Sequence, residues 1–277
     1  MTTPTRFAII GPGVMGEAII AGLLKKELTT PAGVTAAGPR SVRGEELVER
    51  YHIRFAGNAE AAKAAEVIIL SVKPQRLSAV MKDLRGLIPP GALVMSIIAG
   101  AKVSALQAGL DHRAVIRAMP NTPAQIGEGI AVWTAASEAT PEQRELAARI
   151  LGALGEEVFV EDENYLDMAT ALSGTGPAYV FLFMEAMIDA GVHLGFPRRI
   201  AEQLVTQTLR GSVDYYAGRK QHAASLRNEV TSPGGTSAEA LYYLEKAGFR
   251  TAISRAVWAA YERSQALGAG KDAQKPD

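Results

Sequence analysis

Phe7-Ala8-Ile9-Ile10-Gly11-Pro12-Gly13-Val14-Met15-Gly16 is the stretch that decides the fold of this 277-residue chain. Its glycines follow a short apolar strand and fit the G-x-G-x-x-G fingerprint of a dinucleotide-binding turn. In that turn the first glycine allows a tight bend, the second lets the backbone approach a pyrophosphate, and the third lets the next helix pack on the strand. We therefore expect a cofactor to contact Gly11, Pro12, Gly13, Val14, Met15 and Gly16. The alternative is a tight turn that binds no ligand.

The pattern around this turn predicts an α/β domain. As far as about residue 160, short β-rich runs alternate with helix-like stretches, which is typical of βα units that build a mostly parallel sheet. Thr140-Pro141-Glu142-Gln143 has the residues of a capping box at a helix start, and Gly155 is a candidate terminator of that helix. The predicted strands are 7–10, 34–37, 67–72, 93–98, 115–119, 130–134 and 158–160.

Beyond Glu161 the alternation stops and helical spacing takes over. Pro177, Pro197 and the Thr236 region each begin an apolar-periodic stretch, and Gly195 and Gly248 are expected to end helices. The expected organisation is a Rossmann-like dinucleotide-binding domain (1–161), an all-α domain for substrate binding and dimerisation (162–270), and a frayed tail (271–277).

One of these helices predicts an oligomer. The stretch from Pro177 to Leu194 is apolar nearly all round, so it requires burial on all sides. A domain of this size covers such a helix only with difficulty. We therefore expect a homodimer through the helical domain, which can assemble further.

The end of the second strand bears on cofactor choice. NAD-preferring sites usually place Asp or Glu there to hold the ribose 2′-hydroxyl, whereas this chain has Ala36-Ala37-Gly38-Pro39-Arg40-Ser41. No carboxylate repels a 2′-phosphate, and Arg40, Ser41 and Arg43 could hydrogen-bond it. We predict NADPH, with NADH as an alternative cofactor. The other interpretation is that these arginines are solvated loop charges.

Further cofactor contacts are expected where other strands end, because strand ends of an open parallel sheet face the ligand crevice. Val72-Lys73-Pro74 and Ala99-Gly100 lie at two such ends, and Met119-Pro120-Asn121-Thr122-Pro123 follows a third. The prolines stiffen the last loop around Asn121. An exposed strand-end lysine is the alternative interpretation of Lys73.

A second glycine-rich turn, far along the chain, predicts the substrate site. Arg227-Asn228-Glu229-Val230-Thr231-Ser232-Pro233-Gly234-Gly235-Thr236-Ser237 precedes a helical pattern from Ala238 to Ala247. A turn against a helix start leaves backbone N–H groups aimed at one point, which suits a small carboxylate. A plain capping box of Thr236 and Glu239 is the alternative. Leu172-Ser173-Gly174-Thr175-Gly176-Pro177 starts the apolar helix and could line an opposite wall. The predicted substrate contacts are Ser232, Gly234, Gly235, Thr236 and Ser237.

Composition excludes several function classes. Lys plus Arg (29) balance Asp plus Glu (29), so no long-range field favours nucleic acid or an anionic membrane. The absence of cysteine excludes disulfides and thiolate chemistry. The four histidines stand isolated, without triad or metal spacing, so no metal is expected. Apolar runs are shorter than the ~20 residues of a membrane span, and the N-terminus has no export signal. We expect a cytoplasmic protein without nucleic-acid or membrane partners.

Taken together, these motifs resemble the pyrroline-5-carboxylate reductase family over nearly the whole chain. The resemblance rests on the turn 11–16, Val72-Lys73-Pro74, the loop 119–123, Ser173-Gly174-Thr175-Gly176-Pro177-Ala178-Tyr179 and, most specifically, residues 229–236. It implies NAD(P)H-dependent hydride transfer to the C=N bond of the cyclic imine 1-pyrroline-5-carboxylate, giving L-proline in the last step of proline biosynthesis. Two positions depart mildly from the family pattern, because Ser237 and Thr175 stand where members usually have threonine and serine.

The resemblance also implies a mechanism. The substrate carboxylate docks on the amides of residues 234–237, its C=N carbon faces the nicotinamide, and Ser237 is the catalytic candidate that orients or relays a proton to the nitrogen. The ultimate donor is then the substrate's own iminium or a water.

Two other functions share some of these features. A β-hydroxyacid dehydrogenase-like reductase is disfavoured, because that family has a catalytic lysine after its Gly-rich helix and this chain has none until Lys220. A non-catalytic NADPH-binding regulatory protein is disfavoured because it need not keep the turn 232–237.

Overall fold

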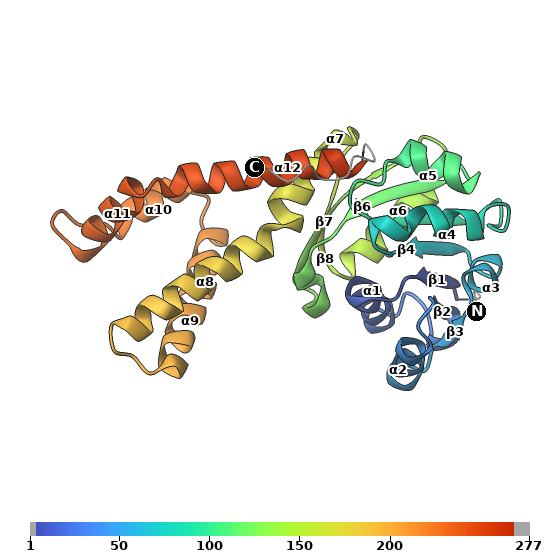
Figure 1. Ribbon diagram of the computed structural model, residues 1–277, viewed down its shortest axis with the longest axis horizontal. Helices are drawn as coiled ribbons and strands as arrows, with labels where there is room; N and C mark the ends of the chain where they lie inside the picture. Colours follow the sequence, from blue (N-terminus) through green and yellow to red (C-terminus); the bar gives the residue numbers. More distant parts are fainter. Residues whose placement is uncertain (1–3, 269–277) are drawn as a thin grey trace. The chain divides into compact units, whose positions relative to one another are not determined.

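The computed structural model describes residues 4–268 and confirms the predicted fold class, a parallel α/β sheet domain followed by helices (Figure 1). The predicted tail 271–277 lies outside the described residues. The strands are β1 (Phe7–Ile10), β2 (Val34–Ala37), β3 (Arg54–Ala56), β4 (Val67–Leu70), β5 (Leu93–Ser96), β6 (Val115–Met119), β7 (Gly129–Ala135) and β8 (Gly155–Phe159).

The helices alternate with these strands and then continue alone. They are α1 (Val14–Lys25), α2 (Ser41–Tyr51), α3 (Asn58–Lys63), α4 (Leu77–Leu84), α5 (Val103–Leu110), α6 (Pro141–Gly152), α7 (Asn164–Ala169), α8 (Gly176–His193), α9 (Arg198–Ala217), α10 (Ala223–Glu229), α11 (Thr236–Lys246) and α12 (Phe249–Gly268). Short 3-10 turns are η1 (Pro31–Gly33), η2 (Pro74–Arg76) and η3 (Thr122–Ile126), and η4 (Thr170–Gly174) is a π-helical turn.

The sheet has the order β3-β2-β1-β4-β5-β6-β7-β8 and is parallel except where β7 pairs antiparallel with β6. Its strand order reverses between β1 and β4, and such a switch point opens a crevice at the carboxyl ends of the two strands. Ser71 N–H donates to the Ile10 carbonyl at 2.9 Å, which extends the pairing of β1 and β4 up to this edge. The turn that follows β1 therefore lies beside the residues that follow β4.

Helices cover both faces of the sheet. Alternate residues of β1 point to opposite faces: Phe7 and Ile9 pack with α1, α2 and α6, whereas Ala8 and Ile10 pack with α3, α4 and α5. Every residue of β1, β2, β4 and β5 is buried. Burial on both faces explains why these strands are continuous apolar runs in the sequence.

The structure corrects several predicted boundaries. β3 was not predicted, β4 and β5 end two residues earlier than expected, and β8 begins at Gly155 rather than Val158. Gly155 does not end α6, which stops at Gly152; it starts β8 with φ +140°, where a Cβ would lie 2.0 Å from the Gly129 carbonyl oxygen. The capping box at Thr140 and Gln143 is confirmed.

A buried ion cluster ties distant segments to the sheet. Arg117 on β6 is 2% exposed and donates to Asp167 of α7 at 2.8 Å and to Glu163 at 3.0 Å. The hydroxyl of Ser264 in α12 donates to the same Asp167 oxygen at 2.9 Å. Since the charges are paired and hydrogen-bonded, the end of α12 is fixed to the unit that contains the sheet.

Of the described residues, 4–176 with 259–268 form one compact unit and 177–258 form a second. The first unit thus includes α7 and the end of α12, both of which lie after residue 161 in the sequence. The domain boundary after residue 161 stays a prediction. The predicted start of the apolar helix within residues 172–177 is confirmed, because α8 begins at Gly176; Ser173 and Gly174 lie in the π-helical turn η4 that precedes it, and Thr175 follows η4. There Thr175 N–H donates to Thr170 O at 2.8 Å.

The second unit consists of helices, and its longest apolar helix is not covered within one chain. α8 buries none of its residues, and Phe181 and Leu182 are 62% and 68% exposed. The continuous helical segment 164–193 is also long and apolar enough, by length and composition alone, to cross a bilayer, with a mean hydropathy of 1.2. A helix that is buried between protein subunits has the same length and composition.

Candidate active site

The turn after β1 has the geometry that its glycines predict. Gly11 has φ +86°, and a Cβ there would lie 2.4 Å from Cγ1 of Val72. A Cβ on Gly16 would lie 2.8 Å from the Ser71 hydroxyl, so this glycine lets α1 approach the end of β4. By contrast, nothing lies within 4 Å of a Cβ built on Gly13. The first and third glycines are thus required by packing, and the second leaves open space for a ligand.

Free backbone donors follow Gly13 at the start of α1. Gly13 precedes α1, and its carbonyl accepts from Glu17 N–H at 2.9 Å, which closes the first helical bond. The N–H groups of Val14, Met15 and Gly16 have no partner within residues 4–268. Free N–H groups at a helix start attract phosphate, because they donate hydrogen bonds and the helix dipole is positive there.

A cavity of about 540 Å³ opens beside the turn. It gathers the ends of β1, β2 and β4 and the helices that follow them, as expected for a crevice at the switch point. Six of the predicted cofactor residues line it, namely Gly11, Pro12, Gly13, Arg40, Val72 and Lys73. The lining residues that were not predicted as cofactor contacts include Gly38, Pro39, Asn58, Ser71, Arg76 and Asp83.

The charge of this cavity is positive. Arg40, Lys73 and Arg76 line it, and none of them has an ion pair within the described part of the chain. Its one lining carboxylate, Asp83, accepts from Asn58 at 3.3 Å. Three unpaired cations fit a ligand that carries several phosphate groups, so the residues present suit a phosphorylated dinucleotide.

Arg43 also lines the cavity, but its guanidinium is already engaged. Its Nε donates to the Pro12 carbonyl at 3.2 Å, one terminal nitrogen donates to Glu46 at 2.8 Å, and the other donates to Glu17. Three of its five N–H donors are thus used within the protein, and the expectation that Arg43 hydrogen-bonds a 2′-phosphate stays a prediction for the other two. Arg40, at the start of α2, remains the free guanidinium next to β2.

Glu17 accepts from three groups of α2. Arg43, Arg50 and the Tyr51 hydroxyl all donate to its carboxylate. Burial by itself would raise the pKa of Glu17, but the hydrogen bonds from Arg43 and Tyr51 and the charge of Arg43 outweigh it and lower the pKa. The carboxylate is therefore ionised and neutralised by its neighbours at neutral pH.

Several predicted cofactor residues do not line the cavity. The Asn121 side chain is used within the protein, where it donates to Ser173 O at 3.2 Å and accepts from Ile130 N–H at 3.0 Å. Gly100 is buried, and a Cβ on it would lie 2.8 Å from the Gly268 nitrogen, so this glycine accommodates the end of α12. The other predicted contacts outside the lining are Val14, Met15, Gly16, Ser41, Pro74 and Ala99.

The second glycine-rich turn lies in the other unit, before α11. Gly234 has φ +71°, and Gly235 N–H donates to the Ser232 carbonyl at 3.0 Å. A Cβ on Gly235 would lie 2.4 Å from the Ser232 hydroxyl oxygen. Gly235, not Thr236, occupies the position before the helix, so the capping box of Thr236 and Glu239 does not form.

This arrangement leaves polar groups of the turn available. The N–H groups of Gly234, Thr236 and Ser237 have no partner within residues 4–268, and neither do the hydroxyls of Ser232, Thr236 and Ser237. Ser232 and Thr236 are exposed, and Ser237 is partly buried. The turn can therefore donate several hydrogen bonds to one small anion.

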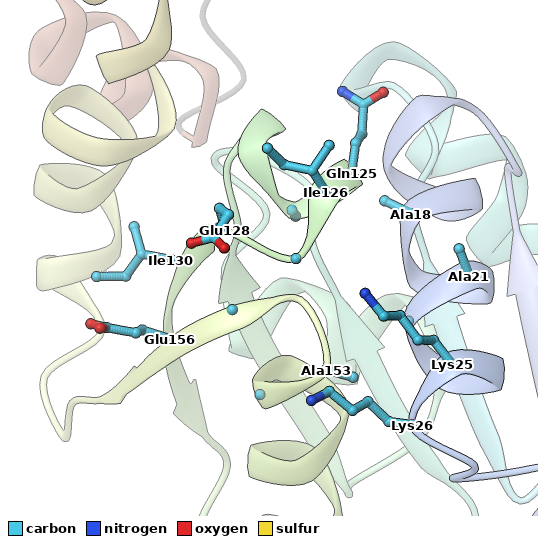
Figure 2. Close-up of a pocket in the computed structure, with 16 residues that line it drawn as sticks. Ala18, Ala21, Lys25, Lys26, Gln125, Ile126, Glu128, Ile130, Ala153 and Glu156 are labelled. Atoms are coloured by element: carbon cyan, nitrogen blue, oxygen red, sulfur yellow. The ribbon is translucent and has the colours of Figure 1, made fainter. Parts of the chain in front are cut away.

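A further cavity, of about 620 Å³, lies between α1 and the start of β7 and β8 (Figure 2). Lys25 and Lys26 extend from α1 on one side, and Glu128 and Glu156 lie on the other. Its charged side chains are all exposed. None of the predicted site residues lines it, and its small residues are explained by close packing, such as that of Gly22 against Ala153.

The described residues contain no group of three His, Asp or Glu side chains that could hold a metal ion. No buried side-chain nitrogen or oxygen in the described part of the chain lacks a partner. Among the free polar groups, those of the cofactor cavity and of the turn 232–237 are gathered in one place each, and both sets suit anions.

Known proteins share this combination of domains. Residues 163–267 match the family model described as pyrroline-5-carboxylate reductase dimerisation, and residues 6–100 match the model described as NADP oxidoreductase coenzyme F420-dependent. A pyrroline-5-carboxylate reductase of Synechocystis is 43% identical over 267 residues, which cover 95% of this chain and 98% of the relative. The enzyme of Pseudomonas aeruginosa is 38% identical over 269 residues, with 96% and 98% covered.

A solved structure agrees with the sequence comparison. The crystal structure of Plasmodium falciparum pyrroline carboxylate reductase with NADP bound superposes with a TM-score of 0.89 at 30% identity, covering 96% of this chain and 100% of the other. Prephenate dehydrogenase from Aquifex aeolicus, with a TM-score of 0.54 and 12% identity, shares the fold alone. The identity over nearly the full length of both chains confirms the resemblance, and the chain belongs to the pyrroline-5-carboxylate reductase family.

Proposed function

We propose that this protein reduces the C=N bond of 1-pyrroline-5-carboxylate to give L-proline, with NADPH as the hydride donor. The observation that carries the proposal is the turn 232–237, whose free N–H groups and hydroxyls suit a small carboxylate. The residues that would hold the dinucleotide are those of the cavity lining, Gly11, Pro12, Gly13, Arg40, Val72, Lys73 and Arg76, together with the free N–H groups of Val14, Met15 and Gly16. When bound, this cofactor supplies the hydride.

The protein's own residues position the imine. The amides of Gly234, Thr236 and Ser237 bind the substrate carboxylate and so orient the ring. Reduction adds a hydride to the C=N carbon and a proton to the nitrogen, and a protonated iminium is the better hydride acceptor. The Ser237 hydroxyl is placed on α11 beside the free amides and orients or relays that proton. A serine hydroxyl is a poor acid by itself, so the proton originates from the iminium or from water.

The preference for NADPH over NADH rests on the charge of the cofactor cavity. Arg40 follows β2 at the start of α2, has no ion pair within residues 4–268, and lies where NAD-preferring sites place a carboxylate. A 2′-phosphate would gain a charge-assisted hydrogen bond there. Asn121, Ala99, Gly100, Ser41 and Pro74 do not line the cavity, so they are weaker candidates for cofactor contacts.

The exposed apolar surface of the second unit supports a homodimer. Phe181, Leu182 and Val213 are each more than half exposed in the single chain, and contiguous exposed apolar residues mark association surfaces. The matched dimerisation model spans these helices. A second copy of the chain covers α8, and dimers can assemble further.

The same proposal places the enzyme in the cytoplasm, without membrane or nucleic-acid partners. A balanced charge of 29 basic and 29 acidic residues gives no long-range attraction to phosphate backbones or anionic lipids. Burial of α8 between subunits accounts for its apolarity.

One assay tests the reaction. Purified protein is mixed with NADPH and 1-pyrroline-5-carboxylate, the loss of NADPH absorbance is followed, and NADH is run in parallel. The proposal predicts imine-dependent oxidation that is faster with NADPH. If NADPH binds but no imine-dependent oxidation occurs, the chain is a non-catalytic NADPH-binding protein and the turn 232–237 is a helix start only.

A further inference from the structure

Glu17 has a carboxylate beside the proposed phosphate-binding turn, where a negative charge is unexpected. It lies in the first turn of α1, directly after the N–H groups that suit a phosphate. An unpaired negative charge at this position would repel the dinucleotide. Its side chain is 19% exposed and is turned to α2, where Arg43, Arg50 and Tyr51 donate to it.

Arg43 connects this carboxylate to the glycine turn. One terminal nitrogen binds Glu17, and Nε donates to the Pro12 carbonyl at 3.2 Å. Because a guanidinium is planar and rigid, fixing one edge of it fixes the direction of the others. The position of Glu17 thus determines where the Pro12 carbonyl is held.

The Pro12 carbonyl belongs to the peptide in the middle of the turn. The N–H of that same peptide, on Gly13, donates to the Gly11 carbonyl at 2.7 Å. Both sides of the peptide plane are therefore fixed, one by Arg43 and the other by Gly11. With that plane fixed, the next N–H groups along the chain, on Val14 and Met15, are left free at the start of α1.

From this geometry we infer that Glu17 is a positioning residue for dinucleotide binding, which acts through Arg43 on the Pro12 carbonyl and shapes the turn that receives the pyrophosphate. Arg43 is a support of the turn, and the recognition of the 2′-phosphate is left to Arg40 and the other unpaired cations. The inference rests on the proposed cofactor. It separates two functions for two arginines that are three residues apart.

The two functions make different predictions for the two cofactors. NADPH and NADH share the pyrophosphate, so loosening the turn weakens both to the same extent. Only NADPH carries the 2′-phosphate, so loss of its ligand weakens NADPH alone. The ratio of the two dissociation constants therefore distinguishes a positioning residue from a phosphate ligand.

The test measures dissociation constants for NADPH and NADH by cofactor fluorescence for the full-length protein. Glu17→Gln is expected to raise both constants about tenfold, the effect of one charge-assisted hydrogen bond, and to leave their ratio unchanged. Glu49→Gln, an exposed α2 carboxylate without an ion pair among the described residues, is the matched control and should change neither.

A double-mutant cycle identifies the path. If Glu17 acts through Arg43, the double variant Glu17→Gln with Arg43→Ala binds no more weakly than Arg43→Ala alone. Arg43→Lys keeps the positive charge but loses the planar set of N–H donors, so it should bind both cofactors as weakly as Arg43→Ala does. This variant also serves as the independent test if thermal melting shows that Glu17→Gln does not fold.

The outcomes are distinct. Unchanged constants in Glu17→Gln, or a selective change for NADPH, would overturn the inference, and the second result would make Arg43 a 2′-phosphate ligand. Wild-type protein that binds neither cofactor would instead overturn the proposed function, and the inference with it.

Discussion

Two glycine-rich turns of this molecule open helices and present free N–H groups, but they are held in different ways. The turn 11–16 is fixed by tertiary neighbours: Val72 and Ser71 contact its glycines, and Arg43 holds a carbonyl. Within residues 4–268 the turn 232–237 has no such distant neighbours in its hydrogen bonds, and it is held by the bond from Gly235 N–H to Ser232 O and by the close approach of Gly235 to Ser232.

The difference indicates how each turn reaches its binding geometry. The first is organised by its own unit before any ligand arrives, which lowers the entropic cost of binding a long dinucleotide. The second is largely exposed, and its hydroxyls have no partner within residues 4–268. Its ligand, a small anion, supplies the missing partners.

The largest expected effect breaks the first turn. Gly11→Ala places a Cβ 2.4 Å from Val72 and keeps a left-handed φ of +86°, which costs about 1–3 kcal/mol for a non-glycine residue. We expect NADPH affinity to fall about 100-fold or more, measured by cofactor fluorescence. Gly86→Ala is the control, because φ is +74° and nothing lies within 4 Å, so only the strain remains. Normal NADPH binding by Gly11→Ala would show that packing does not fix this turn.

The second effect concerns a hydroxyl of the other turn. Ser237→Ala removes a hydroxyl beside the free amides without altering the backbone, and we expect kcat to fall about 100-fold with the NADPH dissociation constant unchanged. Steady-state rates with 1-pyrroline-5-carboxylate measure this. Ser225→Ala, at an exposed serine of α10, is the control. Near-normal turnover would remove Ser237 from the mechanism.

A smaller effect separates the residue that binds the 2′-phosphate from the turn 11–16, which binds both cofactors. Arg40→Glu replaces a free guanidinium by a repulsive carboxylate, and we expect the preference for NADPH over NADH to fall at least about tenfold. The ratio of kcat/KM for the two cofactors measures it. Arg54→Glu, at the far end of β3, should leave the ratio unchanged. An unchanged ratio in Arg40→Glu would exclude Arg40 as the 2′-phosphate ligand.

The smallest effect is on the pH dependence of folding stability. The pKa of Glu17 is lowered in the folded protein from its ordinary value of 4.5, so its stabilising contribution is full above pH 4.5 and is lost as the pH falls through the lower folded pKa. Glu17→Gln should therefore lose stability less steeply below pH 4.5 than the wild type, in urea unfolding at a series of pH values. Parallel curves would show that Glu17 is not linked to folding.

Sequence patterns predicted the sheet well because its central strands are buried on both faces. Short, continuous apolar runs between turn residues, such as Val67–Leu70, are typical of strands that are covered on both faces. β3 escaped prediction because Arg54–Ala56 is a three-residue edge strand that is partly exposed and has no apolar run. The overlong predictions for β4 and β5 have one cause, since apolar residues after a strand end, such as Val72, also pack beside the crevice.

The site could be predicted only where it is local. The spacing of Gly11, Gly13 and Gly16 after a strand predicts the conformation of the first turn, whereas the distant residues that hold it, Val72, Ser71 and Arg43, have no such signal in the sequence. The partnership of Glu17 with Arg43 joins residues 26 positions apart on two helices, and no periodicity reveals it. Asn121 and Gly100 were expected at the cofactor because they follow strands, but the fold uses them to bind η4 and to accommodate α12. The position of Thr236 inside α11 was missed because glycine can also precede a helix.

The most direct test of the comparison is an NADPH titration of Gly11→Ala and Gly235→Ala, side by side and without imine. A Cβ at Gly235 lies 2.4 Å from the Ser232 hydroxyl and so disturbs only the second turn. We expect Gly235→Ala to bind NADPH like the wild type and Gly11→Ala to have lost binding. Equal loss of NADPH affinity in both variants would contradict the assignment of one turn to the cofactor and the other to the substrate.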